Sequence, residues 1–202
     1  MAWKQYTFDA YRHVHMIGGV VVPGITTCIK PLTSYDQINP AVLQAACDWG
    51  TAVHKAVELD CIGALDKDSL DAPLLDTIKQ FEQWATAEGY NLCDFICEIP
   101  MGDASLMFGG IPDLILDGKA IIEIKTRATN MLTDSIQTAA QESLWKKNGG
   151  QRVKEYERWV LELYPDRYRF QKVNHPQAWP RFRKLLDHYH DTQLIRSWRD
   201  QI

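Results

Sequence analysis

The residues of this chain whose types and spacing best suit chemistry are Asp113, Glu123 and Lys125. They lie in or beside two apolar, β-branched runs, residues 111–116 and 120–124, and the Asp-Gly-Lys sequence between the runs is a turn signal. With a three-residue turn, Asp113 lies directly opposite Glu123, the Cβ atoms about 5 Å apart, and Lys125 points to the same face. A two-residue turn would shift this register. The side chains expected on the other face, towards a core, are Leu114, Leu116, Ile122 and Ile124.

Two carboxylates that face each other in a sheet repel, so another group must offset the repulsion. A shared proton would do so, and so would a hard divalent cation, which takes oxygen ligands. An Asp, a Glu and a Lys on one face therefore suit metal-assisted phosphodiester hydrolysis. The cation lowers the pKa of a bound water, and the lysine orients that water or stabilises the charge that develops on phosphorus. A solvated hairpin face with a surface ion pair is the alternative.

A helix upstream of the hairpin carries the next candidate residues. Asn39 followed by proline is a helix start, and the pattern predicts a helix from about Pro40 to about Leu59. Gly50, His54 and Glu58 recur every four residues along one face. A glycine inside a helix costs about 1 kcal/mol relative to alanine, so a close approach of backbone or ligand would explain Gly50.

The order of these features resembles the PD-(D/E)xK nuclease superfamily, and in particular its RecB-like branch. Pro112-Asp113 and Glu123-Ile124-Lys125 match the core motif across a tight turn. Gly50-x-x-x-His54 matches the upstream helix of that branch, which supplies a histidine to the metal. Because imidazole suits Mn²⁺ better than Mg²⁺, the resemblance hints at competence with Mn²⁺.

The helix after the hairpin carries part of a third motif of the RecB-like branch, Gln-x-x-x-Tyr. Gln137 matches the glutamine, but Gln141 stands where the tyrosine would be. This departure puts a stacking or hydroxyl role at position 141 in doubt. Trp145, one turn further on, could replace the stacking.

The resemblance implies roles for nine residues. One or two Mg²⁺ or Mn²⁺ ions would be held by His54, Asp113, Glu123 and the carbonyl of Ile124. Asp113, Glu123 and Lys125 would be catalytic, and Lys125 would position or activate the attacking water. The expected substrate-binding residues are Gln137, Arg127, Thr126 and Gly50. A plain surface charge is the alternative for Arg127, and we expect Glu98 to face solvent rather than the metal.

The expected fold is α/β, with a mixed central β-sheet flanked by helices and a restriction-endonuclease-like core, in one domain over residues 1–202. Gly109-Gly110 would let the chain pass close to a substrate backbone or only turn it. Beyond the hairpin and the helix that starts at Pro40, the expected elements are strands at 11–17 and 20–22, a short helix capped by Thr26-Thr27, a helix from 71–73 to Gly89, strands at 91–100 and 101–108, a helix from Asp134 or Ser135 to Asn148, strands at 155–163 and 168–173, and a helix from 174–176 to about Trp198, with Leu194 inward.

Composition narrows the location and the partners. No apolar run approaches a membrane span, so we expect an intracellular, cytoplasmic protein with no membrane partner. The formal net charge is −4, and the excess of acids lies in the first hundred residues. An acidic chain does not coat nucleic acid indiscriminately, but the more basic second half leaves room for a local channel. The five cysteines include no Cys-x-x-Cys and are expected to be reduced thiols without an iron–sulfur cluster.

The function expected from the resemblance is a divalent-metal-dependent DNA nuclease in recombination, repair or processing, with exonuclease action favoured. Its partner would be a single-stranded or double-stranded DNA end, together with a recombination or single-strand-binding protein. The compact single domain suggests a phage or mobile-element origin. The alternative is a nucleic-acid-binding or assembly protein that kept the fold and lost the chemistry. The intact acidic pair argues against it, because an inactive site has no reason to retain mutual repulsion.

Overall fold

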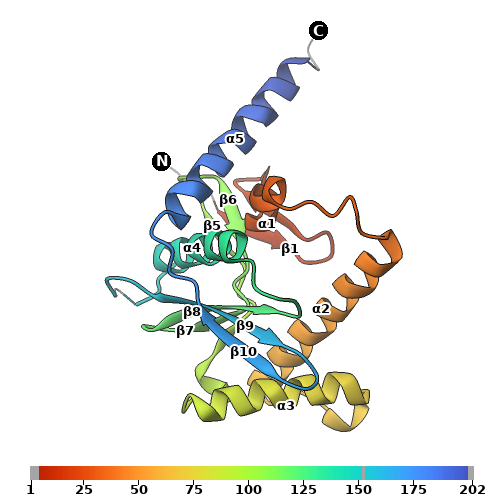
Figure 1. Ribbon diagram of the computed structural model, residues 1–202. Coiled ribbons are helices and arrows are strands. Elements are labelled where there is room, and N and C mark those ends of the chain that lie inside the picture. Colours follow the sequence, from red (N-terminus) through yellow and green to blue (C-terminus); the bar gives the residue numbers. More distant parts are fainter. Residues whose placement is uncertain (1–4, 152, 200–202) are drawn as a thin grey trace.

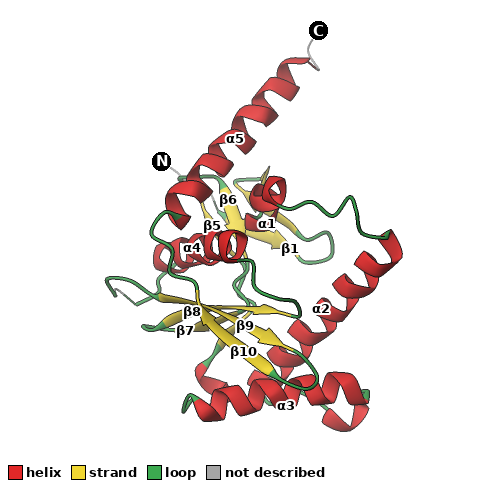
Figure 2. Ribbon diagram, viewed as in Figure 1, coloured by secondary structure: helices red, strands yellow, loops and turns green. Residues whose placement is uncertain are grey.

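A five-stranded mixed sheet lies at the centre of the protein (Figures 1 and 2). The computed structural model describes residues 5–151 and 153–199. The strand order is β10-β9-β8-β7-β4, with β8 and β9 parallel and the other neighbours antiparallel. The five strands are β4 (Ile96–Cys97), β7 (Leu114–Leu116), β8 (Ala120–Lys125), β9 (Glu157–Leu163) and β10 (Tyr168–Lys172). The expected α/β class with a mixed central sheet flanked by helices is confirmed.

Helices cover both faces of this sheet (Figure 2). One face packs on α2 (Pro40–Cys61) and α3 (Ala72–Ala87), and the other on α4 (Met131–Lys147), against which α1 (Ile25–Ile29) and α5 (Ala178–Arg199) lie. Because side chains alternate along each strand, the sheet divides the core in two. Leu114, Leu116, Ile122 and Ile124 belong to the α2–α3 layer, as predicted. Ile115 and Ile121 belong to the α4 layer.

Two small sheets complete the α4 side of the molecule. β1 (Tyr6–Asp9), β2 (Val14–Ile17) and β3 (Val20–Val22) form an antiparallel meander, and β5 (Met101–Asp103) pairs with β6 (Phe108–Gly110). A parallel bridge between Gly24 and Gly109 joins the end of the meander to β6. A Cβ atom at Gly109 would lie 2.6 Å from the ring of His15, so this glycine permits close packing on the chain itself.

Capping explains where the helices begin. The side chains of Asn39 and Asp71 accept hydrogen bonds from the backbone of the first turns of α2 and α3, and a proline in each first turn is already shaped for a helix. Both predicted starts are confirmed. Asn130 caps α4 in the same way, so α4 begins at Met131, earlier than the predicted Asp134 or Ser135. Short 3₁₀ helices at Lys30–Leu32, Lys67–Ser69 and Leu92–Asp94 connect the larger elements.

Several predicted boundaries are wrong, each for a local reason. The chain turns at residues 11–13, so β2 begins at Val14 and the preceding residues form a separate strand, β1. α1 starts after Gly24 without a side-chain cap, so Thr26 and Thr27 do not cap it. The strand predicted at 91–100 opens instead with a 3₁₀ turn closed by the capping box of Asn91 and Asp94.

The last helix also departs from its prediction. It begins at Ala178, beyond the predicted 174–176, and Leu194, expected to face inward, is 50% exposed. α5 extends past the body of the molecule in Figure 1, which accounts for that exposure. Within the part of the chain that the structure describes, none of the helices has the length and apolar character needed to cross a bilayer.

Candidate active site

The hairpin β7–β8 has the register that the sequence predicts. Leu116 pairs with Ala120 and Leu114 with Ile122 across a three-residue turn. Asp113 directly precedes β7, and its Oδ2 accepts a 2.7 Å hydrogen bond from the backbone N–H of Ile124. This bond ties the Asp113 carboxylate to β8 at the residue that follows Glu123.

The catalytic candidates line one cavity of about 440 Å³. Its wall includes Asp113, Glu123 and Lys125 from the hairpin, His54 from α2, and Gln137 and Gln141 from α4. Residues of the meander, of α1 and Tyr189 of α5 also line the cavity. The side chains that could do chemistry are thus gathered where the central sheet meets α2, α4 and the meander.

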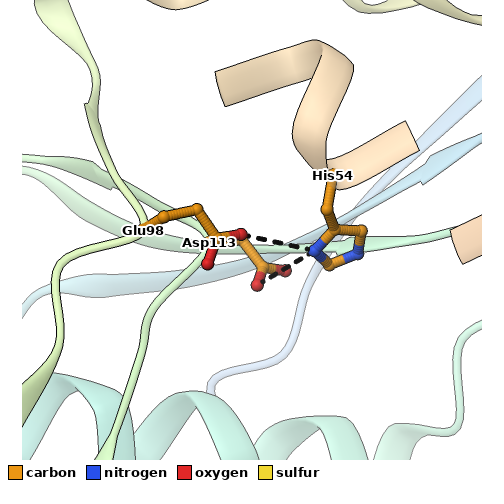
Figure 3. Close-up of side chains that lie close together, drawn as sticks. All are labelled: His54, Glu98 and Asp113. Carbon is orange, nitrogen blue, oxygen red and sulfur yellow. Dashed lines mark ion pairs between the residues drawn. The ribbon is translucent and has the colours of Figure 1, made fainter. Parts of the chain in front are cut away.

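His54, Glu98 and Asp113 form a group that could hold a metal ion (Figure 3). His54 Nδ1 lies 3.4 Å from Asp113 Oδ1 and 3.6 Å from Glu98 Oε1. One potential ligand atom from each residue lies within 4.8 Å of the other two. Two carboxylate oxygens and one imidazole nitrogen are a donor set that suits Mn²⁺ and accepts Mg²⁺ less readily. The residues present therefore fit a divalent cation.

The backbone of Glu98 is strained in a way that serves this group. Glu98 has φ 47°, in the left-handed region that costs a non-glycine residue about 1–2 kcal/mol. It directly follows β4, and its N–H donates to the carbonyl of Asp113, so the turn is tied to the residue beside it. The Glu98 side chain points towards His54 from this strained backbone (Figure 3). The expectation that Glu98 faces solvent is wrong.

The pKa values of His54, Asp113 and Glu98 are shifted by burial and by one another. Burial opposes protonation of His54, but Asp113 and Glu98 outweigh it and raise the pKa of the imidazole. Burial likewise opposes ionisation of Asp113, yet His54, Lys125 and the Ile124 N–H together lower its pKa. For Glu98 burial prevails over His54, and its pKa is raised. Positive charge placed between the two carboxylates is thus stabilised.

Glu123 is held differently from the other acids. Its Oε1 accepts from Lys125 Nζ at 2.5 Å and from Gln137 Nε2 at 2.5 Å, and its Oε2 accepts from Gln141 Nε2 at 2.6 Å. Burial, followed by repulsion from Asp113, raises the pKa of Glu123 to about 7. Glu123 does not belong to the group formed by His54, Glu98 and Asp113, so its role as a metal ligand, like that of the Ile124 carbonyl, stays a prediction.

Lys125 connects the acid pair to α4. Burial alone would lower the pKa of its ammonium, but Glu123 and Asp113 raise it, so the group carries its charge. Its Nζ also lies 3.2 Å from Gln137 Oε1. Gln137 therefore contacts both the lysine and the glutamate, and it is 8% exposed at the cavity wall.

The remaining predicted substrate contacts lie outside the residues that line the cavity. Arg127 makes a bidentate pair with buried Asp134 in the first turn of α4, at 2.8 and 3.2 Å. This pair ties the end of β8 to α4. Gly50 and Thr126 lie next to each other: a Cβ at Gly50 would be 3.6 Å from Thr126 Oγ1, an ordinary contact. Steric need at this point therefore does not explain Gly50.

The sequence did not predict the contacts that Gln141 and Glu98 make in the site. Gln141 follows Gln137 by about one helical turn, and this spacing alone could have indicated that both side chains face the same strand. No sequence pattern could have predicted the contact of Glu98, because the orientation of its side chain depends on a positive φ at that residue. Trp145 is not among the residues that line the cavity, and its indole N–H donates to Asp117 at the turn of the hairpin, so its stacking role stays a prediction.

Comparison of the sequence with protein-family models finds no match, and comparison with curated proteins finds none either.

Proposed function

We propose that this protein is a divalent-metal-dependent DNA nuclease of the RecB-like PD-(D/E)xK type. The observation that carries the proposal is the meeting, in one cavity, of the His54–Glu98–Asp113 group with the Glu123–Lys125 pair. Donors for a hard cation and a buried, charged lysine beside them are the parts that phosphodiester hydrolysis requires. The restriction-endonuclease-like assignment of the core belongs to the same proposal.

The roles of the residues follow from their contacts. His54, Glu98 and Asp113 would hold the cation, which when bound polarises the phosphate and supplies an activated water. Asp113 is kept in place by the Ile124 N–H. Lys125, held by Glu123 and Gln137, orients the attacking water or stabilises charge on the phosphate oxygens. Gln137 and Gln141 fix Glu123. A direct displacement of this kind needs no covalent enzyme intermediate.

The decisive variants are Asp113→Asn and Lys125→Ala. Each is expected to lower cleavage of labelled DNA in Mg²⁺ or Mn²⁺ by about a hundredfold or more, because Asp113 would help to hold the cation and Lys125 would act on the water or the phosphate. Asp76→Asn and Lys79→Ala are matched controls, since these residues form an exposed ion pair on α3. Urea unfolding of all four variants separates loss of chemistry from loss of fold. Cleavage by either site variant at the wild-type rate would remove the assignment.

The same assay sorts the mode of action. Exonuclease action, which the resemblance favours, predicts that linear DNA labelled at either end is degraded while circular DNA of the same sequence persists. Nicking of the circle would instead indicate an endonuclease. DNA binding by the wild type without cleavage in either metal would favour the alternative, a binding or assembly protein that has lost the chemistry.

A further inference from the structure

The meander presents a row of aromatic rings that runs from the cavity wall to solvent. The ring of Tyr6 stacks on His15 with centroids 6.0 Å apart, His15 lies 4.9 Å from Phe8, and Phe8 lies 5.2 Å from His13. His15 is buried, whereas His13 is exposed, and both line the cavity. Two residues before His13, at the turn between β1 and β2, the side chain of Tyr11 is 97% exposed. The row thus leads outward from the candidate active site.

The inner end of the row is rigid. The hydroxyl of Tyr6 and Nδ1 of His15 are hydrogen-bonded at 2.7 Å. The His15 ring lies 3.4 Å from the place of a Cβ atom at Gly24 and 2.6 Å from that of a Cβ atom at Gly109, so it packs closely on both glycines. Burial, with a smaller effect of His13, lowers the pKa of His15 to about 4, so the ring is neutral near pH 7. The exposed side chains of Tyr11 and His13 are therefore carried by a hairpin whose inner rings are held in place and uncharged.

Fixed positive charge is scarce along the cavity. Among the described residues that line it, Lys125 is the single lysine or arginine, and it is paired with Glu123. Double-stranded DNA is bound chiefly through cationic side chains that neutralise phosphates. Aromatic side chains instead stack on the unpaired bases of single strands, whatever the base sequence. A cavity of about 440 Å³ is also of the size that holds a small molecule rather than a duplex.

We propose that the β1–β2 hairpin is a stacking platform for single-stranded DNA, with Tyr11 and His13 receiving successive bases as the strand enters the cavity. The proposal rests on the proposed nuclease function in taking DNA as the substrate, and it specifies the strand form. Arg12 lies between Tyr11 and His13 in the sequence; its side chain is 76% exposed, and its Nε lies 4.0 Å from Asp9 Oδ2. Its guanidinium is therefore placed to contact a phosphate of the stacked strand.

The direct test is binding without cleavage. A fluorescent single-stranded 12-mer of thymidylate and a blunt duplex of the same length are titrated with protein in EDTA, and anisotropy is recorded. The wild type is expected to bind the single strand more tightly than the duplex. Tyr11→Ser and His13→Asn are each expected to weaken single-strand binding about tenfold, the loss of one stacked base. Asparagine suits position 13 because it tolerates the left-handed φ of 52° found there.

Two further variants separate stacking from general effects. Arg12→Gln should reduce the slope of log affinity against log salt concentration by the equivalent of about one phosphate contact, whereas Tyr11→Ser should leave that slope unchanged. Ile62→Ala removes an exposed apolar side chain at the C-terminal end of α2 and should bind like the wild type. Thermal unfolding of each variant verifies the fold.

Failure of this proposal is distinguishable from failure of the nuclease assignment. Equal affinity of the wild type for both DNA forms, no measurable binding, or unchanged binding by both ring variants would overturn the platform. Each of these results leaves the metal-dependent cleavage assay untouched. Conversely, a wild type that cleaves no DNA but binds single strands through Tyr11 and His13 would remove the nuclease function and keep the platform.

Discussion

At the scale of single residues, Glu123 is a carboxylate in a buried environment, where an ionised group needs hydrogen-bond donors. The side chain is 2% exposed, and each of its oxygens is matched by donors from β8 or α4. A buried carboxylate that loses such a donor bears the cost of an unsatisfied charge, whereas a satisfied one is tolerated. Lys125, Gln137 and Gln141 thus make it possible for an acid to occupy this position.

Replacing Gln141 tests this account. Gln141→Met keeps the volume of the side chain but removes the donor to Glu123 Oε2, for which the described residues offer no second donor. We expect a loss of about 1–2 kcal/mol in the free energy of unfolding, moderated because the amide oxygen of Gln141 is itself buried without a partner. Urea unfolding measures the change. Gln44→Met, on an exposed turn of α2, is the control, and an equal effect of the two substitutions would refute the account.

Single-residue predictions succeeded where one local period governs the outcome. Alternation along β8 placed Glu123 and Lys125 on one face and Ile122 and Ile124 on the other, and the structure agrees. Alternation does not reveal a contact whose partner comes from elsewhere in the fold. Arg127 lies two residues beyond Lys125, yet its partner is the buried acid of α4, and no local period encodes that contact.

At the scale of elements, the turn of the hairpin β7–β8 is fixed by a cluster of donors around Asp117. Its Oδ1 accepts from Tyr156 Oη at 2.7 Å and Trp145 Nε1 at 2.9 Å, and from the N–H groups of Gly118 and Gln151. Burial opposes ionisation, but these bonds prevail and lower the pKa of Asp117. One carboxylate therefore connects the hairpin turn to α4 and to the segment before β9.

This cluster predicts a dependence of stability on pH. Because the pKa of Asp117 is lower in the folded protein than the ordinary value of about 4, its ionised form stabilises the fold above that pH. The contribution is lost as the pH falls through the folded-state pKa. Asp117→Asn should therefore cost about 1 kcal/mol at pH 7, after allowance for screening by solvent, and progressively less below pH 4.

Urea unfolding between pH 7 and pH 3 measures the difference. Asp166→Asn is the control, because Asp166 occupies the turn of the second hairpin but is exposed and pairs only with neighbouring Arg167 among the contacts described. If the free energies of unfolding of the wild type and of Asp117→Asn differ by the same amount at every pH, the ionised carboxylate has no such role.

Element types were predictable here, and element ends were less so. Caps written in the sequence, Asn39 and Asp71, gave correct helix starts because their side chains satisfy the first backbone N–H groups. Asn130 does the same for α4, although an Asp and a Ser a few residues later offered equally plausible caps. Where several side chains can cap, packing on the sheet decides among them.

At the scale of the whole molecule, the candidate metal group is assembled from distant parts of the chain. His54 belongs to α2, Glu98 directly follows β4, and Asp113 directly precedes β7. The three side chains converge only when α2 has docked on the sheet. An ion that binds this group binds the folded state, and binding of that kind raises stability.

Thermal unfolding with Mn²⁺ tests the group as a unit. At a concentration about a hundredfold above its dissociation constant, the ion would add about 2.7 kcal/mol, which raises the Tm of a chain of this size by roughly 5–10 °C. His54→Gln and Glu98→Gln should abolish most of the shift, because each removes a ligand. His188→Gln, on the exposed side of α5, should keep it. A shift that persists in both ligand variants would place the ion elsewhere.

The sheet and its two helical layers could be anticipated from the order of motifs, but the small sheets that close the cavity could not. β5 and β6 are three residues each, and β1 was not separated from the strand that follows it. Such short strands carry little periodic signal. They are specified by contacts with one another and with α1 and α4, which become visible only in the assembled fold.

The absence of a side chain at residue 109 sets how low the meander lies over the cavity. The His15 ring fills the space that a methyl group would need there, and the same ring forms part of the cavity wall. Even alanine at this position would force the His15 ring or the backbone beside it to shift, and with it part of the cavity wall. A residue with no side chain therefore helps to set the shape of the cavity that holds His54 and Asp113.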